Sequence, residues 1–136
     1  MDDCIFCKIA AGKIPCSKVY EDADTLVFLD IRPVNKGHVL AIPKKHYRWV
    51  WDIPSKESSE IMPKLQKVAK AVQKATKCDL VVMTVVGDEV PHAHIHLIPK
   101  FHDDWLKFWP SKEYSEGEME EYRKKIEQSL KQPKPL

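Results

Sequence analysis

The chain has 136 residues, of which 31% are charged, and its formal net charge is +2. This length suits one ordinary domain, so we expect residues 1–136 to form a single domain with a core over about residues 4–110. The charge is too balanced to indicate nucleic-acid binding by electrostatics alone. No apolar run approaches the length of a membrane span, and the first residues lack the pattern of a secretory signal. We therefore expect a cytoplasmic protein whose four cysteines are thiols or metal ligands.

Apolar periodicity predicts an α+β domain with mostly antiparallel strands and the helices to one side. A short helix over residues 4–11 should end at Gly12. Pro63 should kink or restart a later helix, because proline lacks the N–H of the helical hydrogen bond. The strand over residues 79–86 is apolar almost throughout, which predicts burial on both of its faces. In chain order we expect strands over residues 18–21, 25–30 and 38–43, a helix over residues 55–77, strands over residues 79–86 and 92–98, and a charged helix over residues 115–130.

Histidine alternates with apolar residues at His92, His94 and His96. A period of two predicts a β-strand with the three imidazoles on one face. Such a row is costly as packing, because each ring carries hydrogen-bonding groups that must be satisfied. A merely polar outer face would more naturally use Thr, Lys or Glu, so the pattern indicates chemistry. Spacing alone leaves two possibilities open, a nucleophilic imidazole or a set of metal ligands.

Cys4 and Cys7 lie one helical turn apart near the start of the chain. Such a pair can be redox-active, can hold a metal, or can be two buried thiols. A thioredoxin-like redox role would need a strand before the motif, and the motif here begins at residue 4. His46 and His92 would complete a tetrahedral zinc site with the two thiols. The spacing permits this site without requiring it.

The stretch His92–Ile98 fits the pattern His-φ-His-φ-His-φ-φ, in which φ is apolar. Other short matches occur in order along the chain: Cys4-Ile-Phe-Cys-Lys-Ile, Ile14-Pro, Val19-Tyr-Glu-Asp, Phe28-Leu-Asp-Ile, Pro33-Val-Asn-Lys-Gly-His and Ile42-Pro-Lys-Lys-His. Over roughly residues 4–99 the chain therefore resembles the histidine triad (HIT) superfamily. The resemblance implies an α+β fold with a five-stranded antiparallel sheet, a kinked central helix and a C-terminal helix, usually as a homodimer.

The resemblance also implies an activity, that of a hydrolase or transferase acting on a nucleotide's α-phosphate. The substrate would be a nucleoside phosphoramidate or a dinucleoside polyphosphate. His94 would attack the phosphorus and form a covalent nucleotidyl-imidazole, which is reasonable because neutral imidazole is nucleophilic near pH 7. His96 would hydrogen-bond the phosphate or protonate the leaving group. His38 would contact the phosphate or orient His94.

Further residues follow from the resemblance as parts of the nucleotide and metal sites. Asp30 would accept hydrogen bonds from the ribose hydroxyls. The remaining nucleotide contacts would come from Phe6, Ile9, Phe28, Ile31, Glu89 and Val90. A structural zinc would be held by Cys4, Cys7, His46 and His92, so that His92 braces the strand bearing His94. The expected partners are a small nucleotide and a second copy of the chain, without nucleic acid or membrane, and Cys16 and Cys78 are expected to be inert.

One stretch departs from the family pattern. Many members have Gly-Gln-Ser/Thr-Val before the first histidine, where this chain has Gly87-Asp88-Glu89-Val90. Two acids near a phosphate would repel it unless they point away or are neutralised. An altered specificity, a cationic leaving group or slow turnover would each fit. Two alternatives therefore stay open, a nucleotide-binding or interaction protein with weak catalysis and a metalloenzyme that uses the histidine strand. The aromatic segment over residues 105–109 could reach a partner's pocket or pack beneath the last helix.

Overall fold

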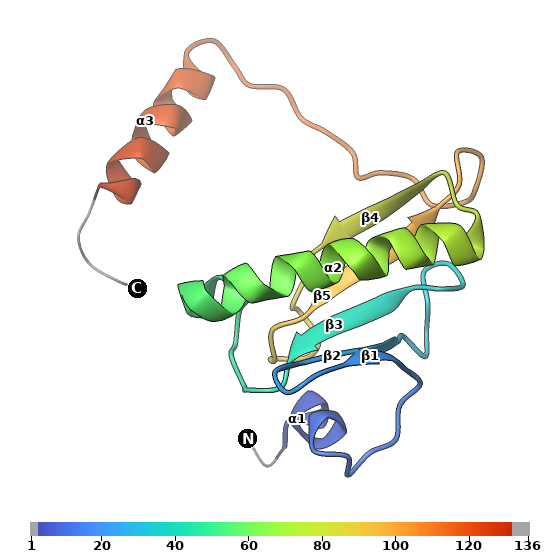
Figure 1. Cartoon of the computed structure of the whole chain (residues 1–136). Coiled ribbons are helices and arrows are strands. Elements are labelled where there is room, and N and C mark those ends of the chain that lie inside the picture. The colour runs from blue at the N-terminus through green and yellow to red at the C-terminus, as the bar shows by residue number, and fades with distance from the viewer. Residues whose placement is uncertain (1–2, 132–136) are drawn as a thin grey trace. The chain divides into compact units, whose positions relative to one another are not determined.

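A five-stranded antiparallel sheet with the order β1-β2-β3-β5-β4 forms the centre of the fold (Figure 1). The computed structural model describes residues 3–131, which divide into two units between Leu106 and Lys107. The sheet and the first two helices belong to the first unit, and the third helix to the second. These elements confirm the expected α+β class with central and C-terminal helices. In chain order they are α1 (Ile5–Ala10), β1 (Lys18–Glu21), β2 (Thr25–Leu29), β3 (Val39–Pro43), the short helix η1 (Val50–Asp52), α2 (Ser55–Thr76), β4 (Leu80–Thr84), β5 (Ile95–Lys100) and α3 (Glu118–Leu130).

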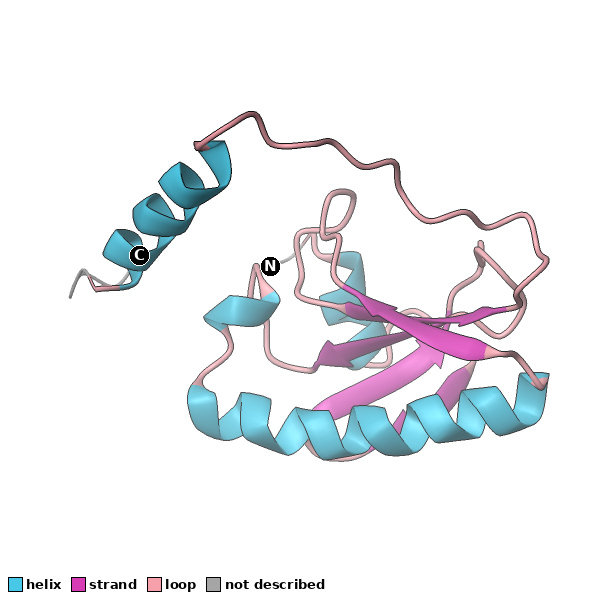
Figure 2. Ribbon diagram, turned by 90° about the horizontal axis from the view of Figure 1, so that it is seen from above, coloured by secondary structure: helices cyan, strands magenta, loops and turns pink. Residues whose placement is uncertain are grey.

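The two faces of the sheet are covered by different helices. On one face, Val39 and Ala41 of β3 join a core with the buried side of α2 (Figure 2). On the other face, Leu40 and Ile42 pack with Phe6 of α1. The expectation that the helices lie to one side is therefore wrong. The reason is that β2 and β3 are apolar on both faces, so each face needs a cover.

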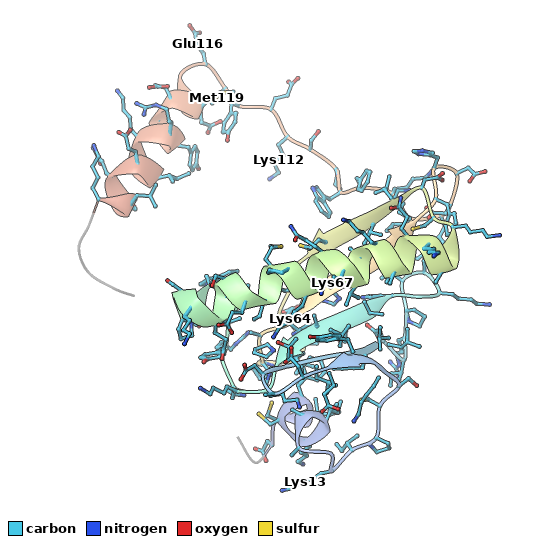
Figure 3. All side chains as sticks on the ribbon, viewed as in Figure 1. Lys13, Lys64, Lys67, Lys112, Glu116 and Met119 are labelled. Atoms are coloured by element: carbon cyan, nitrogen blue, oxygen red, sulfur yellow. The ribbon has the colours of Figure 1, made fainter. Side chains whose placement is uncertain are left out.

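Helix α2 runs without interruption through Pro63, so the expected restart is absent. Its buried positions, Ile61, Leu65, Val68 and Val72, lie on both sides of the proline and pack against the same sheet face. Tertiary packing of this apolar stripe holds the helix together across the missing hydrogen bond. Lys64 of α2, labelled in Figure 3, also donates to the Thr25 hydroxyl of β2 at 3.0 Å.

Strand β4 is an edge strand, which corrects the expectation that it is buried on both faces. None of its five residues is fully buried, and Met83 is 43% exposed. An apolar sequence cannot distinguish an edge strand from a central one, because that depends on which strands pair. The opposite edge, β1, carries Lys18 and Glu21, charges of the kind that protect an edge from further pairing. Strand β4 has no such charge.

The histidine-bearing segment is only partly a strand. Strand β5 begins at Ile95, so His92 and His94 precede the regular ladder instead of lying within it. The register that pairs Ala41 with Ile95 would place Ala93 opposite Pro43, which has no N–H to extend the ladder. Ala93 instead donates its N–H to the Tyr47 carbonyl at 2.7 Å. Alternation nevertheless persists, because Ala93 and Ile95 lie in the α2-side core while His94 meets Phe6 of α1.

The second unit consists of an extended segment and α3. Helix α3 begins at Glu118, later than the expected start at 115, because Gly117 precedes it with a left-handed φ of 80°. Its apolar side chains Met119, Tyr122 and Ile126 are exposed. The aromatic segment over residues 105–109 is divided between the units, since Trp105 donates its indole N–H to Asn35 within the first. No helix among residues 3–131 is long and apolar enough to cross a membrane.

Candidate active site and metal cluster

Four candidate metal ligands converge beside the first turn of α1. Cys4 caps this helix by accepting the Cys7 N–H at 3.2 Å, which places both thiols on one side. His46 follows β3, and His92 precedes β5. The His92 Nδ1 atom lies 3.3 Å from Cys4 Sγ and 3.4 Å from Cys7 Sγ, and His46 Nδ1 lies 3.3 Å from Cys7 Sγ. All four ligand atoms lie within 4.8 Å of one another, so this cluster could bind a metal ion.

The chemistry of these four side chains fits zinc. Nε2 of His92 lies 2.8 Å from the Pro43 carbonyl oxygen, which can only accept. Nε2 must therefore carry the proton, so the Nδ1 lone pair is directed at the thiols. Burial, and then hydrogen bonding with Cys4, raises the pKa of Cys7 to about 11. Because burial disfavours the thiolate of Cys7, a cation would supply the missing charge. Two sulfurs with two imidazoles form a tetrahedral set that suits zinc.

His94 is held in one tautomer by the backbone. Its Nδ1 lies 2.7 Å from the His92 carbonyl oxygen, so Nδ1 donates and Nε2 keeps a free lone pair. The ring is buried and meets the Phe6 ring edge-on, at 5.0 Å between centroids. An imidazole that is fixed in this way presents its nucleophilic nitrogen in one direction.

A second hydrogen-bond chain fixes His38 and His96. The Val34 backbone N–H donates to Nδ1 of His38 at 3.1 Å, so Nε2 of His38 carries that ring's proton. This Nε2 lies 2.9 Å from Nδ1 of His96 and donates to it. Nε2 of His96 must then carry a proton in the neutral ring. These hydrogen bonds therefore leave a lone pair on Nε2 of His94 and an N–H donor on Nε2 of His96. The centroids of the two rings are 5.0 Å apart.

The rings of His38 and His96 are both neutral around pH 7. Burial, and then the neighbouring His94 and His38, lowers the pKa of His96 to about 4. Burial also lowers the pKa of His38, although Asp30 opposes the shift, with its Oδ2 at 3.7 Å from Nε2. The oxygen and nitrogen atoms of Asp30, His38 and His96 are close enough to suggest a second metal site. The proton on Nε2 of His38 argues against it, because that nitrogen has no lone pair for a metal.

The structure brings some of the expected nucleotide contacts together and not others. Phe6 and Phe28 form one buried cluster, against which Ile9 and Val90 pack. Ile31, by contrast, is 94% exposed. Glu89 is exposed, as is its neighbour Asp88. Cys16 and Cys78 are free thiols outside the metal cluster.

Sequence reasoning missed the backbone groups that orient the imidazoles. The Val34 N–H and the Pro43 carbonyl leave no trace in a residue pattern, because every residue supplies a carbonyl and nearly every one an N–H. It also did not anticipate the stacking at Arg48-Trp49-Val50-Trp51, where an arginine lies beside two tryptophans. Arginine stacks readily on aromatic rings, and here the guanidinium carbon of Arg48 lies 3.8 Å from the centre of the Trp49 ring.

The HIT domain family matches residues 11–103 of the chain, which therefore belongs to the HIT family. An adenosine 5′-monophosphoramidase of Schizosaccharomyces pombe is 37% identical over 131 residues, covering 94% of this chain and 98% of the relative. A crystal structure from Streptococcus mutans is 38% identical with a TM-score of 0.88, covering 96% of this chain and 87% of the other. A crystal structure of a zinc-bound histidine triad protein from Mycobacterium smegmatis is 28% identical with a TM-score of 0.70, covering 94% of this chain and 98% of the other.

The assignment of ring protons can be checked by nuclear magnetic resonance. In long-range proton–nitrogen spectra at pH 7, we expect His94 to carry its proton on Nδ1 and His96 on Nε2. His96 should stay neutral as the pH falls and titrate only near pH 4, because its pKa is lowered to about that value. A proton on Nε2 of His94, or a His96 midpoint at the ordinary value near 6.5, would contradict this description.

Proposed function

We propose that this HIT family protein is a nucleotidyl hydrolase or transferase that works through a covalent intermediate on His94. The observation that carries the proposal is the 2.7 Å contact between Nδ1 of His94 and the His92 carbonyl oxygen, which leaves the Nε2 lone pair free. A nucleophile needs a free electron pair that is held in one direction. The similarity to an adenosine 5′-monophosphoramidase supports the same class of reaction.

The proposed reaction has two displacements. In the first, Nε2 of His94 forms a bond to the α-phosphorus while the bond from phosphorus to the leaving nitrogen or oxygen breaks. A leaving amine takes up one proton from the medium. In the second, a water oxygen attacks the phosphorus, the bond to His94 breaks, and one proton is released. The His92 carbonyl stabilises the positive ring of the intermediate through the proton on Nδ1 of His94.

The neighbouring side chains support this reaction by hydrogen bonding. His96 presents an Nε2–H that can donate to a phosphate oxygen as charge builds there. The depressed pKa of His96 favours this donor role over that of a proton-transferring acid. His38 acts as a positioning residue, since it donates to Nδ1 of His96. Asp30 would accept hydrogen bonds from the ribose hydroxyls. Its backbone N–H donates a hydrogen bond to the His38 carbonyl at 2.9 Å, which fixes its position.

A nucleoside phosphoramidate is the substrate that we favour, with dinucleoside polyphosphates as the second class. Asp88 and Glu89 replace polar residues that many family members use here, but both are exposed, so water and salt screen their charge. The tautomers argue against the alternative of a catalytic metal on the histidine segment, because His94 would be the one ligand there: His96 and the neighbouring His38 each carry a proton on Nε2. A binding protein with weak catalysis is the remaining alternative, and the turnover measurement below distinguishes it. The expected cytoplasmic location stays a prediction.

We further propose that the Cys4, Cys7, His46 and His92 cluster holds a structural zinc ion. Four protein ligands would fill the coordination sphere, which leaves no open position for a substrate. The ion would tie α1 to the two chain segments that flank the site. His92 would then serve twice, as a ligand through its ring and as the hydrogen-bond acceptor for His94 through its carbonyl.

Pairing of two copies along β4 would explain the exposed apolar character of that strand. In one copy the outer edge of β4 has no neighbouring strand, and Met83 is 43% exposed. Strands with an uncharged apolar edge readily pair with another chain. We therefore propose a homodimer whose interface includes β4.

Replacing the nucleophile tests the activity. We expect His94→Ala to lower kcat for adenosine 5′-phosphoramidate by about 1,000-fold or more, because of His38, His94 and His96 only His94 keeps a lone pair that faces no partner. The Kd for AMP should change only a few-fold, since the ribose and base contacts remain. The surface variant His102→Ala is the matched control and should behave as wild type. A His94→Ala protein that keeps wild-type turnover would exclude the covalent route, and a wild type without turnover would favour the binding protein.

Removing a ligand tests the zinc proposal. Purified protein should contain about one zinc ion per chain, and Cys7→Ser should lose the metal and several kcal/mol of stability. Cys16→Ser, which lies outside the cluster, should keep both. The readouts are elemental analysis and thermal unfolding. Wild-type protein that is metal-free yet as stable after chelation as before would refute the site.

Introducing a charge at one edge of the sheet tests the proposed dimer. Met83→Lys on β4 should shift the protein to monomer in sedimentation analysis at micromolar concentration, because it buries a charge in the proposed interface. Val19→Lys makes the same change on the opposite edge strand β1, where Val19 is 47% exposed, and should leave the dimer intact. A wild type that is monomeric, or a Met83→Lys protein that remains dimeric, would contradict the interface.

A further inference from the structure

We propose that Asn35 and Asp104 are positioning residues that hold the ring of His38 against His96, an inference that rests on the proposed function. Nε2 of His38 donates to Nδ1 of His96 at 2.9 Å, which keeps the proton of His96 on Nε2, where the proposed reaction uses it. Two further bonds fix His38, and both come from the loop over residues 33–37. The Val34 N–H donates to Nδ1 of His38 at 3.1 Å, and the His38 N–H donates to the Asn35 carbonyl at 3.1 Å. The position of this loop therefore decides which nitrogen of His96 carries the proton.

The loop begins where strands β3 and β5 stop pairing. Their register pairs Val39 with Leu97, so that Gly37 falls opposite Pro99, which has no N–H to continue the ladder. Gly37 turns the chain here with a φ of +102°, a conformation that favours glycine. The side chain of Asn35 continues the connection, because its Nδ2 donates to the Pro99 carbonyl at 2.8 Å. One side chain therefore ties the loop before β3 to the end of β5.

The rest of the Asn35 amide is held by the segment that follows β5. Nδ2 of Asn35 also donates to Oδ2 of Asp104 at 3.0 Å, and the indole N–H of Trp105 donates to Oδ1 of Asn35 at 3.2 Å. A side-chain amide offers two N–H donors and a carbonyl acceptor. Each of these groups has a partner here, which gives the Asn35 side chain a single orientation.

Asp104 is in turn a fixed acceptor. Besides Asn35, its carboxylate accepts from the N–H groups of Phe101 and Leu106 at 2.8 and 2.9 Å, and from the amine of Lys100 at 3.0 Å. The side chains of Asp104 and Lys100 are 12% and 8% exposed, so water and salt screen their charges little. The Phe101 N–H, and then Lys100 and the Leu106 N–H, lower the pKa of Asp104 to about 2, although burial opposes the shift. The carboxylate therefore stays ionised around pH 7 and always accepts from Asn35.

The consequence for the proposed reaction is the placement of one hydrogen-bond donor. An N–H on Nε2 of His96 stabilises the charge that builds on the phosphate oxygens. A neutral imidazole carries its proton on either nitrogen, so His96 keeps this donor only while its Nδ1 accepts from His38. If the loop shifts, the proton can move to Nδ1, and Nε2 then presents a lone pair that repels the phosphate. An anchor that served stability alone would not change this tautomer.

Removing the anchor tests this assignment. We expect Asn35→Ala to lower kcat for adenosine 5′-phosphoramidate about 10-fold, because His96 loses its fixed donor, and to leave KM nearly unchanged. In long-range proton–nitrogen spectra at pH 7, the proton of His96 should change from Nε2 alone to a mixture of both nitrogens. Asp104→Ala should cause the same change. Adding it to Asn35→Ala should have little further effect on the tautomer, because Asp104 acts through Asn35.

Tyr20→Phe is the matched control, since it removes a part-buried hydrogen bond to a carboxylate, 2.7 Å long and made to Asp22, on the edge strand β1. It should keep the wild-type kcat and the wild-type His96 tautomer, whatever its melting temperature. A His96 proton that stays on Nε2 in Asn35→Ala, or a kcat equal to that of the control, would overturn the proposal.

A gentler variant decides the matter if Asn35→Ala does not fold. Asp104→Asn keeps the size of the side chain but offers one oxygen to four donors. It should move part of the His96 proton to Nδ1, and a proton found on Nε2 alone would overturn the proposal.

The spectra need no turnover, which separates this proposal from the proposed function. If the wild type turns over no substrate but Asn35→Ala moves the His96 proton, the proposed function fails while the positioning role stands. If His94→Ala abolishes turnover and Asn35→Ala leaves the His96 proton in place, the proposed function stands while the positioning role fails.

Discussion

The site depends on the hydrogen bond between the His92 carbonyl and Nδ1 of His94, at 2.7 Å. His92 is itself fixed at both ring nitrogens, because Nε2 donates to the Pro43 carbonyl and Nδ1 faces the two thiols. One buried residue thus joins the candidate metal site to the proposed nucleophile. Through this connection, the end of β3 and the cap of α1 determine the direction in which the lone pair of His94 points.

Three adjacent imidazoles are stable in a small domain only because almost every ring nitrogen has an assigned partner. The backbone carbonyls of Pro43 and His92 take one nitrogen each, the thiols face another, and His38 bonds to the fourth, Nδ1 of His96. Buried polar atoms without partners are costly. The nitrogens left over, Nε2 of His94 and Nε2 of His96, are those that the proposed chemistry uses. A lone pair beside an N–H donor suits the transfer of a phosphoryl group. The lone pair attacks the phosphorus, and the donor stabilises the charge that builds on the phosphate oxygens.

Much of this could be predicted from the sequence, because it depends on local periodicity. Alternation put the three histidines on one face and Ala93 on the other, and the cysteine spacing of one helical turn placed both thiols together. The start of β5 at Ile95 could not be predicted, since it depends on Pro43 from a distant strand. The exposed edge at β4 was missed because strand order is a property of the whole sheet. The tautomers depend on contacts between segments far apart in the chain, such as the one between His38 and His96.

The central claim is that His94 becomes covalently attached to the nucleotide, and mapping the attachment tests it most directly. Wild-type protein would be mixed with adenosine 5′-phosphoramidate, quenched within a turnover, digested and analysed by mass spectrometry. The account predicts an adenylyl group on the peptide containing residues 92–96, with fragmentation placing it on His94. Adenylyl on His96 or His38, or continued turnover with no adduct at any time point, would contradict it.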